Sequence, residues 1–199
     1  MKKATKSFIC IILSAAFLFV LSACTGSAEL TEDNVSKTVE SAAYALHEFN
    51  SKDLKKYVDS DTLSYIISLA DKHEQFAQLG RAMFENLDIT VKSIDLEGKT
   101  VEVEVVNKDL FFVASNFTYD LTNNYSTIQL LSLLNDESFL NSSLNNLTND
   151  ISQTAAFTEP KTVQLSIVQG KKNLILKVDE EAENAISGGA LSAVKSIIK

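Results

Sequence analysis

The strongest constraint on the fold is a strand-like segment in the middle of the chain. In "TVEVEVV" the apolar side chains of Val101, Val103 and Val105 alternate with the carboxylates of Glu102 and Glu104. Successive side chains of a strand point to opposite faces, so this alternation predicts a strand with one buried face and one face in water. We therefore expect the three valines to pack under helices and the two glutamates to be exposed.

Two hairpins are predicted around this segment. In "LDITVKSIDLEGKTVEVEVV" two β-branched runs flank a turn centred on Gly98. A second hairpin follows Pro160 in "KTVQLSIVQGKKNLILKVDEE" and turns at Gly170 and Lys171. Its expected inward-facing residues are Val163, Leu165, Ile167, Leu174, Leu176 and Val178. Together the hairpins predict an antiparallel sheet of about four strands.

Helices are predicted before and after the hairpins. Apolar residues recur every three or four positions over 35–49, as on one face of a helix. A short helix over 51–58 and a third helix over 60–86 are expected to follow. After the second hairpin, a short helix and a final helix are separated by a break at Gly188 and Gly189.

The region 109–155 is predicted to be an insertion of two or three helices between the hairpins. From Leu140 to Ile151 the apolar spacing is clearly helical. The aromatic and β-branched content of "LFFVASNFTYDL" also permits a strand, which we keep as an alternative. The predicted fold class is α+β, with residues 35–199 forming a single domain. Its N-terminal helices, helical insertion and C-terminal helix pack on one face of the sheet.

The first 23 residues have the three parts of a bacterial export signal: a basic start, the apolar core "FICIILSAAFLFVL", and small residues before Cys24. "LSAC" also matches the bacterial lipobox, whose cysteine receives a diacylglyceryl group and becomes the first residue after cleavage. We predict a lipoprotein signal peptide over 1–23, lipid attachment at Cys24 and a tether over 24–34. The alternative is a retained N-terminal membrane helix, but the apolar core falls short of the roughly 20 residues that span a bilayer.

Charge and cysteine content agree with a lipid-anchored protein. The formal net charge is -8, which repels nucleic acid and gives no attraction to anionic lipid. We therefore expect no nucleic-acid partner and contact with the membrane through the anchor at Cys24. The only other cysteine is Cys10, inside the predicted signal peptide, so Cys24 would have no partner for an intramolecular disulfide.

Three segments carry a resemblance to a known group of proteins. These are "FNSKDLKKYV" after the first helix, "VNKDL" at the end of a strand, and "AISGGALSAV" near the C-terminus. With them the chain resembles small lipoproteins of low-GC Gram-positive bacteria with a cystatin-like or nuclear-transport-factor-2-like fold. The resemblance implies a cone formed by sheet and helices, and a place on the outer face of the bacterial cell membrane. It implies no particular biochemical role.

The sequence contains few groups suited to catalysis. None of the inward-facing strand residues can transfer a proton. His47 and His73 are each followed by Glu, but neither belongs to an HExxH motif, and we interpret both as surface or boundary residues. No cofactor or metal is expected.

Two functional classes remain. The first is a non-catalytic envelope module that binds a protein, a peptide or an apolar ligand. The alternative is an isomerase- or dehydratase-like enzyme that uses a buried Tyr44, Tyr57, Tyr65 or histidine inside the cone. A cavity of several hundred cubic ångströms with a polar group at its base would favour the enzyme, and a core filled with aliphatic side chains would favour the binding module.

If the function is recognition, the insertion is the expected place, because a long connection between core strands is not needed to close the sheet. The candidate ligand or partner surface comprises five apolar residues: Phe111, Phe112, Leu130, Leu134 and Phe139. The plainer interpretation is that they complete the core. Burial of all five by intramolecular contacts would exclude the binding surface.

Overall fold

The computed structural model describes residues 27–197, and the side chains of residues 27–195. The predicted signal peptide and Cys24 lie outside the described residues. Residues 27–30 have no helix or strand, and they are fastened to the second hairpin. The amide of Ala28 donates to the carbonyl oxygen of Gly170 at 2.8 Å, and the side chain of Gln169 donates to the carbonyl oxygen of Ala28 at 3.0 Å.

In the described part of the chain, the helices before the first hairpin are α2 (Glu32–Glu48), α3 (Ser51–Tyr57), α4 (Asp61–Ala70) and α5 (Glu74–Phe84). The buried side of α2 is the stripe that the sequence predicts. The single helix expected over 60–86 is wrong, because α4 ends at Ala70 and α5 begins only at Glu74. The backbone of the linking residues closes α4, since the amides of Asp71 and His73 donate to carbonyl oxygens of its last turn at 2.9 Å.

The sheet has the order β1-β5-β4-β3-β2. Its strands are β1 (Val58–Asp59), β2 (Asp88–Asp95), β3 (Thr100–Val106), β4 (Lys161–Gln169) and β5 (Leu174–Lys177). The two predicted hairpins are confirmed, and β3 and β4 pair antiparallel between them. The difference from prediction is β1, whose two residues pair with β5 in parallel and make the sheet mixed.

The faces of β3 follow the predicted alternation. Val101, Val103 and Val105 are buried, and Glu102 is exposed. Glu104 is half-buried, and its carboxylate forms an ion pair with the ammonium of Lys92 at 2.8 Å on the wet face of the sheet. The apolar face is covered by α2, α3 and α9 (Glu180–Ile186), which contact the strands.

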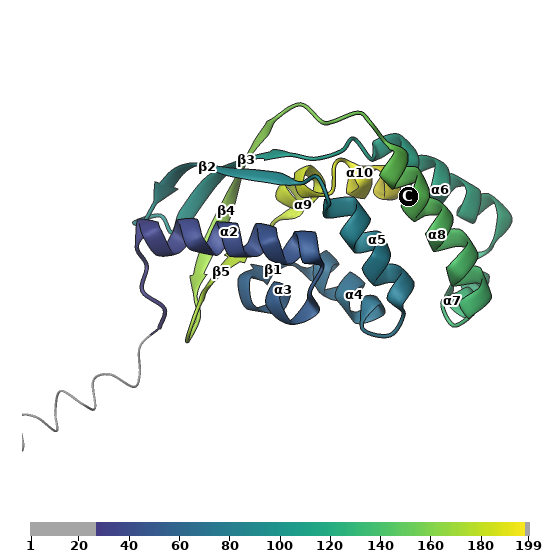
Figure 1. Cartoon of the computed structure of the whole chain (residues 1–199), viewed down its shortest axis with the longest axis horizontal. Helices are drawn as coiled ribbons and strands as arrows, with labels where there is room; N and C mark the ends of the chain where they lie inside the picture. The colour runs from purple at the N-terminus through teal and green to yellow at the C-terminus, as the bar shows by residue number, and fades with distance from the viewer. Residues whose placement is uncertain (1–26, 198–199) are drawn as a thin grey trace, which may run out of the picture.

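The insertion consists of three helices: α6 (Phe111–Asn124), α7 (Thr127–Leu133) and α8 (Glu137–Gln153). The strand considered for "LFFVASNFTYDL" is therefore wrong. The last helix, α10 (Ala190–Ile197), packs mainly on α6, and α5 packs on α8. In Figure 1 the turn ends of the hairpins lie at one end of the long axis, and α7 lies at the other.

Two buried polar residues connect the end of β3 to the surrounding helices α5, α8 and α9. Asn107 follows β3, and its amide donates to the carbonyl oxygens of Met83 at 3.0 Å and Ile186 at 2.8 Å. The ammonium of Lys108 donates to carbonyl oxygens at the end of α8, those of Ile151 at 3.2 Å and Ser152 at 3.0 Å. These bonds satisfy the polar groups at the point where four helices meet the end of a strand.

The predicted break before the last helix is also confirmed, at a close backbone contact. Gly188 has a φ of 60° and Gly189 a φ of 83°. A Cβ atom on Gly188 would collide with the carbonyl oxygen of Lys108. Gly188 therefore allows α9 and α10 to turn directly against the junction between β3 and α6.

Candidate functional site

An apolar cavity of about 590 Å³ lies between the apolar face of the sheet and the helices. We call it the internal cavity. Its apolar walls include Val39 and Leu46 of α2, Leu63 and Ile66 of α4, Phe76 and Met83 of α5, Val113, Ala114, Phe117 and Leu121 of α6, Leu130 of α7 and its C-cap Leu134, Leu147 and Ile151 of α8, Leu165 of β4, Leu176 of β5, Ile186 of α9, and Leu191 and Val194 of α10.

The polar side chains on the walls are few. They are the hydroxyl groups of Ser60, Thr62, Tyr65, Thr118, Thr122 and Ser187, and the carboxylate of Glu183. Among the described residues, no lysine, arginine or histidine lines the internal cavity. Such a space favours the hydrocarbon part of a ligand and offers no positive charge to an anion.

Glu183 forms the one charged position of the internal cavity. It lies in the first turn of α9, and both of its carboxylate oxygens accept hydrogen bonds from the start of α4. The hydroxyl of Thr62 donates to one oxygen at 2.8 Å, and the hydroxyl of Ser60 donates to the other. Ser60 is also the N-cap of α4, where its oxygen accepts from the amide of Leu63 at 3.0 Å. The carboxylate is therefore held in place by two residues at the start of α4, which are 121 and 123 positions away in the chain.

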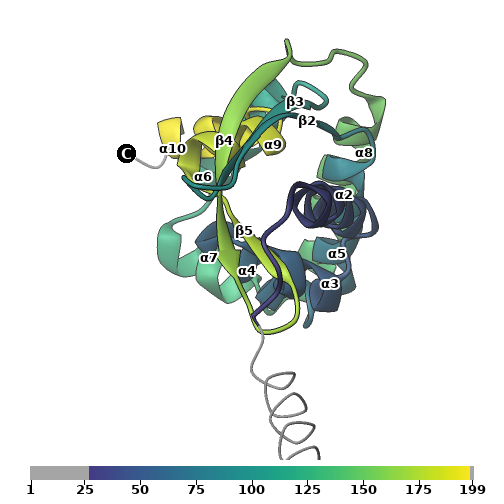
Figure 2. The ribbon, with the colours of Figure 1, turned by 90° about the vertical axis from the view of Figure 1, so that its left-hand side faces the viewer.

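One side of the internal cavity has a thin wall. All residues of α7, which the structure describes in full, are half-buried or exposed. Leu130 and Leu134 face the cavity, whereas Ile128 is 81% exposed and Leu131 is 61% exposed. In Figure 2, α7 and α10 lie on the opposite side of the molecule from α2, α5 and α8. The thin wall is thus the side where a ligand has the least structure to displace.

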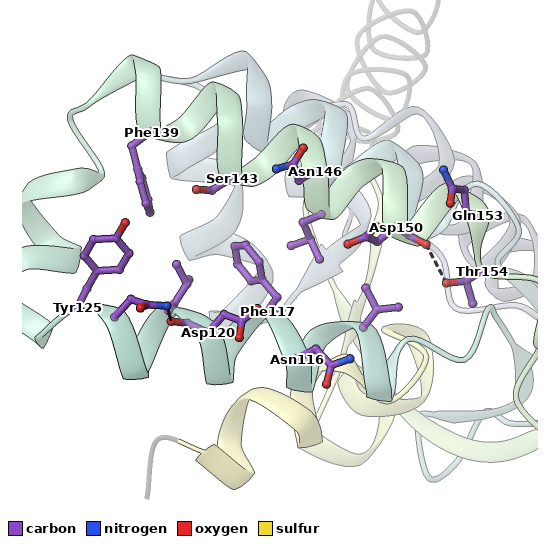
Figure 3. Close-up of a pocket in the computed structure, with 14 residues that line it drawn as sticks. Asn116, Phe117, Asp120, Tyr125, Phe139, Ser143, Asn146, Asp150, Gln153 and Thr154 are labelled. Atoms are coloured by element: carbon purple, nitrogen blue, oxygen red, sulfur yellow. Dashed lines mark hydrogen bonds between the residues drawn. The ribbon is translucent and has the colours of Figure 1, made fainter.

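A second hollow lies on the surface between α6 and α8 and has a volume of about 610 Å³. Figure 3 shows Tyr125 and Phe139 facing one another near one end of this α6–α8 groove, with Asp150 and Thr154 at the other. The two rings pack edge to face, with 5.6 Å between their centres. Most other lining groups are amides, carboxylates and hydroxyls: Asn116, Asp120, Asn124, Ser143, Asn146 and Gln153.

The α6–α8 groove and the internal cavity share a wall. Val113, Phe117 and Leu121 of α6 and Leu147 of α8 line both hollows. A single layer of apolar side chains therefore separates a polar surface groove from an apolar interior.

The two histidines connect elements of the scaffold. The imidazole of His47 lies 2.8 Å from the carbonyl oxygen of Leu87. His73 precedes α5, and its Nδ1 lies 3.0 Å from the carboxylate of Glu137 at the start of α8. Gln75 also donates to Glu137 at 3.1 Å. The hydrogen bond to His73, and then the one to Gln75, lower the pKa of Glu137 below its usual value.

The structure distributes the five predicted surface residues over three places. Phe111 and Phe112 are exposed on the outside of α6, with their rings edge to face at 5.5 Å between centres. Leu130 and Leu134 line the internal cavity, and Phe139 lines the α6–α8 groove. The five residues are therefore not all buried, and they do not form one continuous surface.

The tyrosines considered for catalysis are not buried. Tyr44 is 66% exposed and Tyr65 is 59% exposed, while Tyr57 is half-buried beside Tyr44 in a shallow surface hollow. Of the three, Tyr65 lines the internal cavity. The carboxylate that does lie there, Glu183, was not singled out from the sequence. Glutamates are common in the first turn of a helix, as Glu180 and Glu181 are here. The sequence therefore does not distinguish Glu183 from these two neighbours.

Within residues 27–197, no group of three or more His, Cys, Asp or Glu side chains is placed to hold a metal ion. None of the helices described is both long and apolar enough to cross a membrane. Comparison with protein-family models, with curated proteins and with solved structures found no match to this chain. The chemistry of the internal cavity is therefore the basis for a functional hypothesis.

Proposed function

We propose that this protein is a non-catalytic module that binds a small apolar molecule in the internal cavity. The observation that supports the proposal is the combination of a volume of about 590 Å³ with apolar walls contributed by nearly every described helix and by four strands. This volume falls within the roughly 300–1,000 Å³ that is usual for small-molecule sites. The ligand would be an acyl chain or another elongated hydrocarbon body.

The energetics of an empty cavity support occupation. Residual cavities destabilise proteins by about 24 cal/mol per Å³, so a closed and empty space of this size would cost roughly 14 kcal/mol. That is comparable with the whole folding stability of a typical domain, about 5–15 kcal/mol. The space is thus expected to be occupied by a ligand or to open to solvent beside α7. Burial of a twelve-carbon chain, at about 0.8 kcal/mol per methylene, would contribute roughly 10 kcal/mol before the costs of binding.

Binding of N-phenyl-1-naphthylamine, an uncharged apolar probe, to the purified full-length chain tests the proposal. We expect a saturable rise in fluorescence. Ala114 is small, half-buried and part of the cavity wall, so Ala114→Phe should fill the space and weaken binding at least ten-fold. Asn123→Phe adds the same ring to an exposed position of the same helix and should leave the affinity unchanged.

Circular dichroism and thermal unfolding would establish that both variants fold. Absence of saturable binding to the unaltered chain, or equal binding by the unaltered chain and a folded Ala114→Phe variant, would contradict the proposal.

The module would act on the outer face of the bacterial cell membrane, attached through a diacylglyceryl group on Cys24. The segment that precedes α2, at the purple end of the ribbon, and α7 lie toward opposite ends of the molecule in Figure 1. A short attachment at the N-terminal end would direct α7 away from the membrane. Cys24→Ser should abolish acylation and release the domain to the soluble fraction or block its processing. Native protein with residues 1–23 intact and no lipid would contradict this placement.

A cavity of about 590 Å³ that contains the carboxylate of Glu183 is also the arrangement expected of the second candidate, an isomerase- or dehydratase-like enzyme. A carboxylate in an apolar cavity is a group that can move a proton beside a carbonyl. Against this, both of its carboxylate oxygens already accept hydrogen bonds from the hydroxyl groups of Ser60 and Thr62. Exchange of deuterium into the carbon next to the carbonyl of an added apolar ketone, lost in Glu183→Gln, would favour the enzyme over the binding module.

A further inference from the structure

We infer that Glu183, with Ser60 and Thr62, forms the polar end of the internal cavity and selects a ligand whose head group donates a hydrogen bond. The ligand class is an alkyl alcohol or alkyl amine, and long-chain carboxylates are rejected. This inference rests on the proposed function, because it requires a ligand in the internal cavity.

The first reason is that the hydroxyl donors of the walls are already used. A hydroxyl group has one proton to donate. The protons of Ser60 and Thr62 are donated to Glu183. Ser187 donates to the carbonyl oxygen of Asn184 at 3.1 Å.

The threonine hydroxyls of α6 that line the internal cavity also donate their protons within the protein. Thr118 donates to the carbonyl oxygen of Ala114 at 2.8 Å, and Thr122 donates to that of Thr118 at 2.9 Å. Among the described wall residues, the remaining hydroxyl is that of Tyr65, which is 59% exposed at the rim. The hydroxyl protons in the buried part of the wall are therefore already used in hydrogen bonds within the protein. What this part of the wall offers to a ligand is hydrogen-bond acceptors.

The second reason is the acceptor capacity that Glu183 retains. An ionised carboxylate has about four lone-pair positions, and the two hydroxyls occupy two of them. A ligand hydroxyl or ammonium group could donate to the others without displacing Ser60 or Thr62. Such a bond to a charged acceptor is stronger than one between neutral groups, and it would orient the hydrocarbon body along the apolar walls.

The third reason is charge. Because no cationic side chain of the described residues lines the internal cavity, a bound carboxylate would have Glu183 as its charged neighbour. Glu183 is half-buried, so its repulsion of a neighbouring carboxylate is only partly screened by water, and burying an unpaired carboxylate is costly in itself. An alcohol avoids both costs, and an amine pairs with Glu183.

Competition with the probe distinguishes these head groups. The probe is N-phenyl-1-naphthylamine, bound to the full-length chain and displaced by 1-dodecanol, dodecylamine or dodecanoate, which share one chain length. We expect the alcohol or the amine to displace the probe at a concentration at least ten-fold lower than dodecanoate does. Preference for the alcohol identifies a neutral head group and preference for the amine a cationic one, and each supports the inference.

The variants assign the preference to Glu183. Glu183→Gln should reduce the difference between the head groups to less than about three-fold. Glu181→Gln is the matched control, because Glu181 is on the same helix, is exposed and pairs with Lys161. It should keep the preference of the unaltered chain.

Dodecanoate binding as tightly as the alcohol and the amine would overturn the inference, as would an unchanged preference in a folded Glu183→Gln variant. The ranking on the unaltered chain remains a test if that variant does not fold. Failure of the probe itself to bind would overturn the proposed function, whereas probe binding without discrimination among the head groups would overturn this inference alone.

Discussion

The sheet and the helical insertion use their apolar residues differently. On the sheet, Val101 and Val103 have no exposed surface, and the residues opposite them on β4 are buried as well. On the insertion, Phe112 is 71% exposed and Ile128 is 81% exposed. Most apolar residues of the sheet are buried in the core, although Leu165 and Leu176 also line the internal cavity. The insertion divides its apolar residues between the wall of the internal cavity and the outer surface. We propose that the sheet maintains the fold and that the insertion supplies part of the ligand site.

The largest expected effect is the loss of a sheet residue that does not line the cavity. Ile167 is 4% exposed on β4 and packs in the main core. Ile167→Ala should lower the free energy of unfolding by about 3 kcal/mol, because buried methyl groups are lost and a void remains. Leu131→Ala, on the exposed side of α7, should change it by less than about 0.5 kcal/mol. Urea denaturation measures both, and similar losses would contradict the division between the two regions.

The junction between the regions should show the next largest effect. Asn107→Ala removes the amide that donates to the carbonyl oxygens of Met83 and Ile186. Leaving buried acceptors unpaired costs about 1–3 kcal/mol, so we expect a loss of about 2 kcal/mol in the free energy of unfolding. Asn124→Ala is the control, because its amide donates to Asp120 on an exposed surface. A loss in the control as large as in Asn107→Ala would show that the buried bonds are not the cause.

A smaller effect on stability, with a clear effect on binding, is expected at α7. Leu134→Asn places an amide on the wall of the internal cavity, and Leu131→Asn places the same amide on the outer side of the same short helix segment. Leu134→Asn should weaken binding of N-phenyl-1-naphthylamine several-fold, because a polar group must be desolvated beside the probe. Leu131→Asn should leave the affinity unchanged. Equal affinities in the two variants would show that α7 is not part of the ligand site.

The smallest expected effect concerns pH. The pKa of Glu137 is lowered by its hydrogen bonds to His73 and then Gln75, from an ordinary value of 4.5. A carboxyl group with a lowered pKa in the folded state contributes stability above its ordinary pKa, and this contribution is lost as the pH falls below about 4.5. Glu137→Gln should therefore reduce the melting temperature at pH 6 more than at pH 3. Glu97→Gln, in the exposed turn of the first hairpin, is the control. A difference of the same size in both variants would contradict the role of His73 and Gln75.

Much of the fold was predictable because the patterns that define it are local. The alternation of valine and glutamate on β3 predicted its buried and exposed faces, apart from the partial burial of Glu104 beside Lys92. Gly188 marked the break before α10, since a positive φ is a property of a single residue. The division between α4 and α5 was missed, because Ala70 and Ala77 on either side of it are spaced as on one helical face, although residues 71–73 do not continue the helix.

The candidate site was predictable only in part. Leu130 and Leu134 were singled out and lie on the wall of the internal cavity, but Phe111, Phe112 and Phe139 point elsewhere. Helical spacing predicts which residues share a face of a helix. It does not predict which of several faces contacts a neighbouring helix. The assignment of α6, α7 and α8 to their neighbours depends on contacts between distant parts of the chain.

The amino-acid sequence by itself determined the periods of the strands and most helices, the acidic charge and the predicted export signal. These depend on residues only a few positions apart, whose side chains alternate with the geometry of a strand or helix. The tertiary structure alone decided that a cavity remains between the sheet and the insertion, and that Glu183 meets Ser60 and Thr62 inside it. Glu183 is more than 120 positions away from Ser60 and Thr62 in the chain. The volume left between packed elements depends on the position of every helix relative to the sheet. No local sequence pattern specifies these positions.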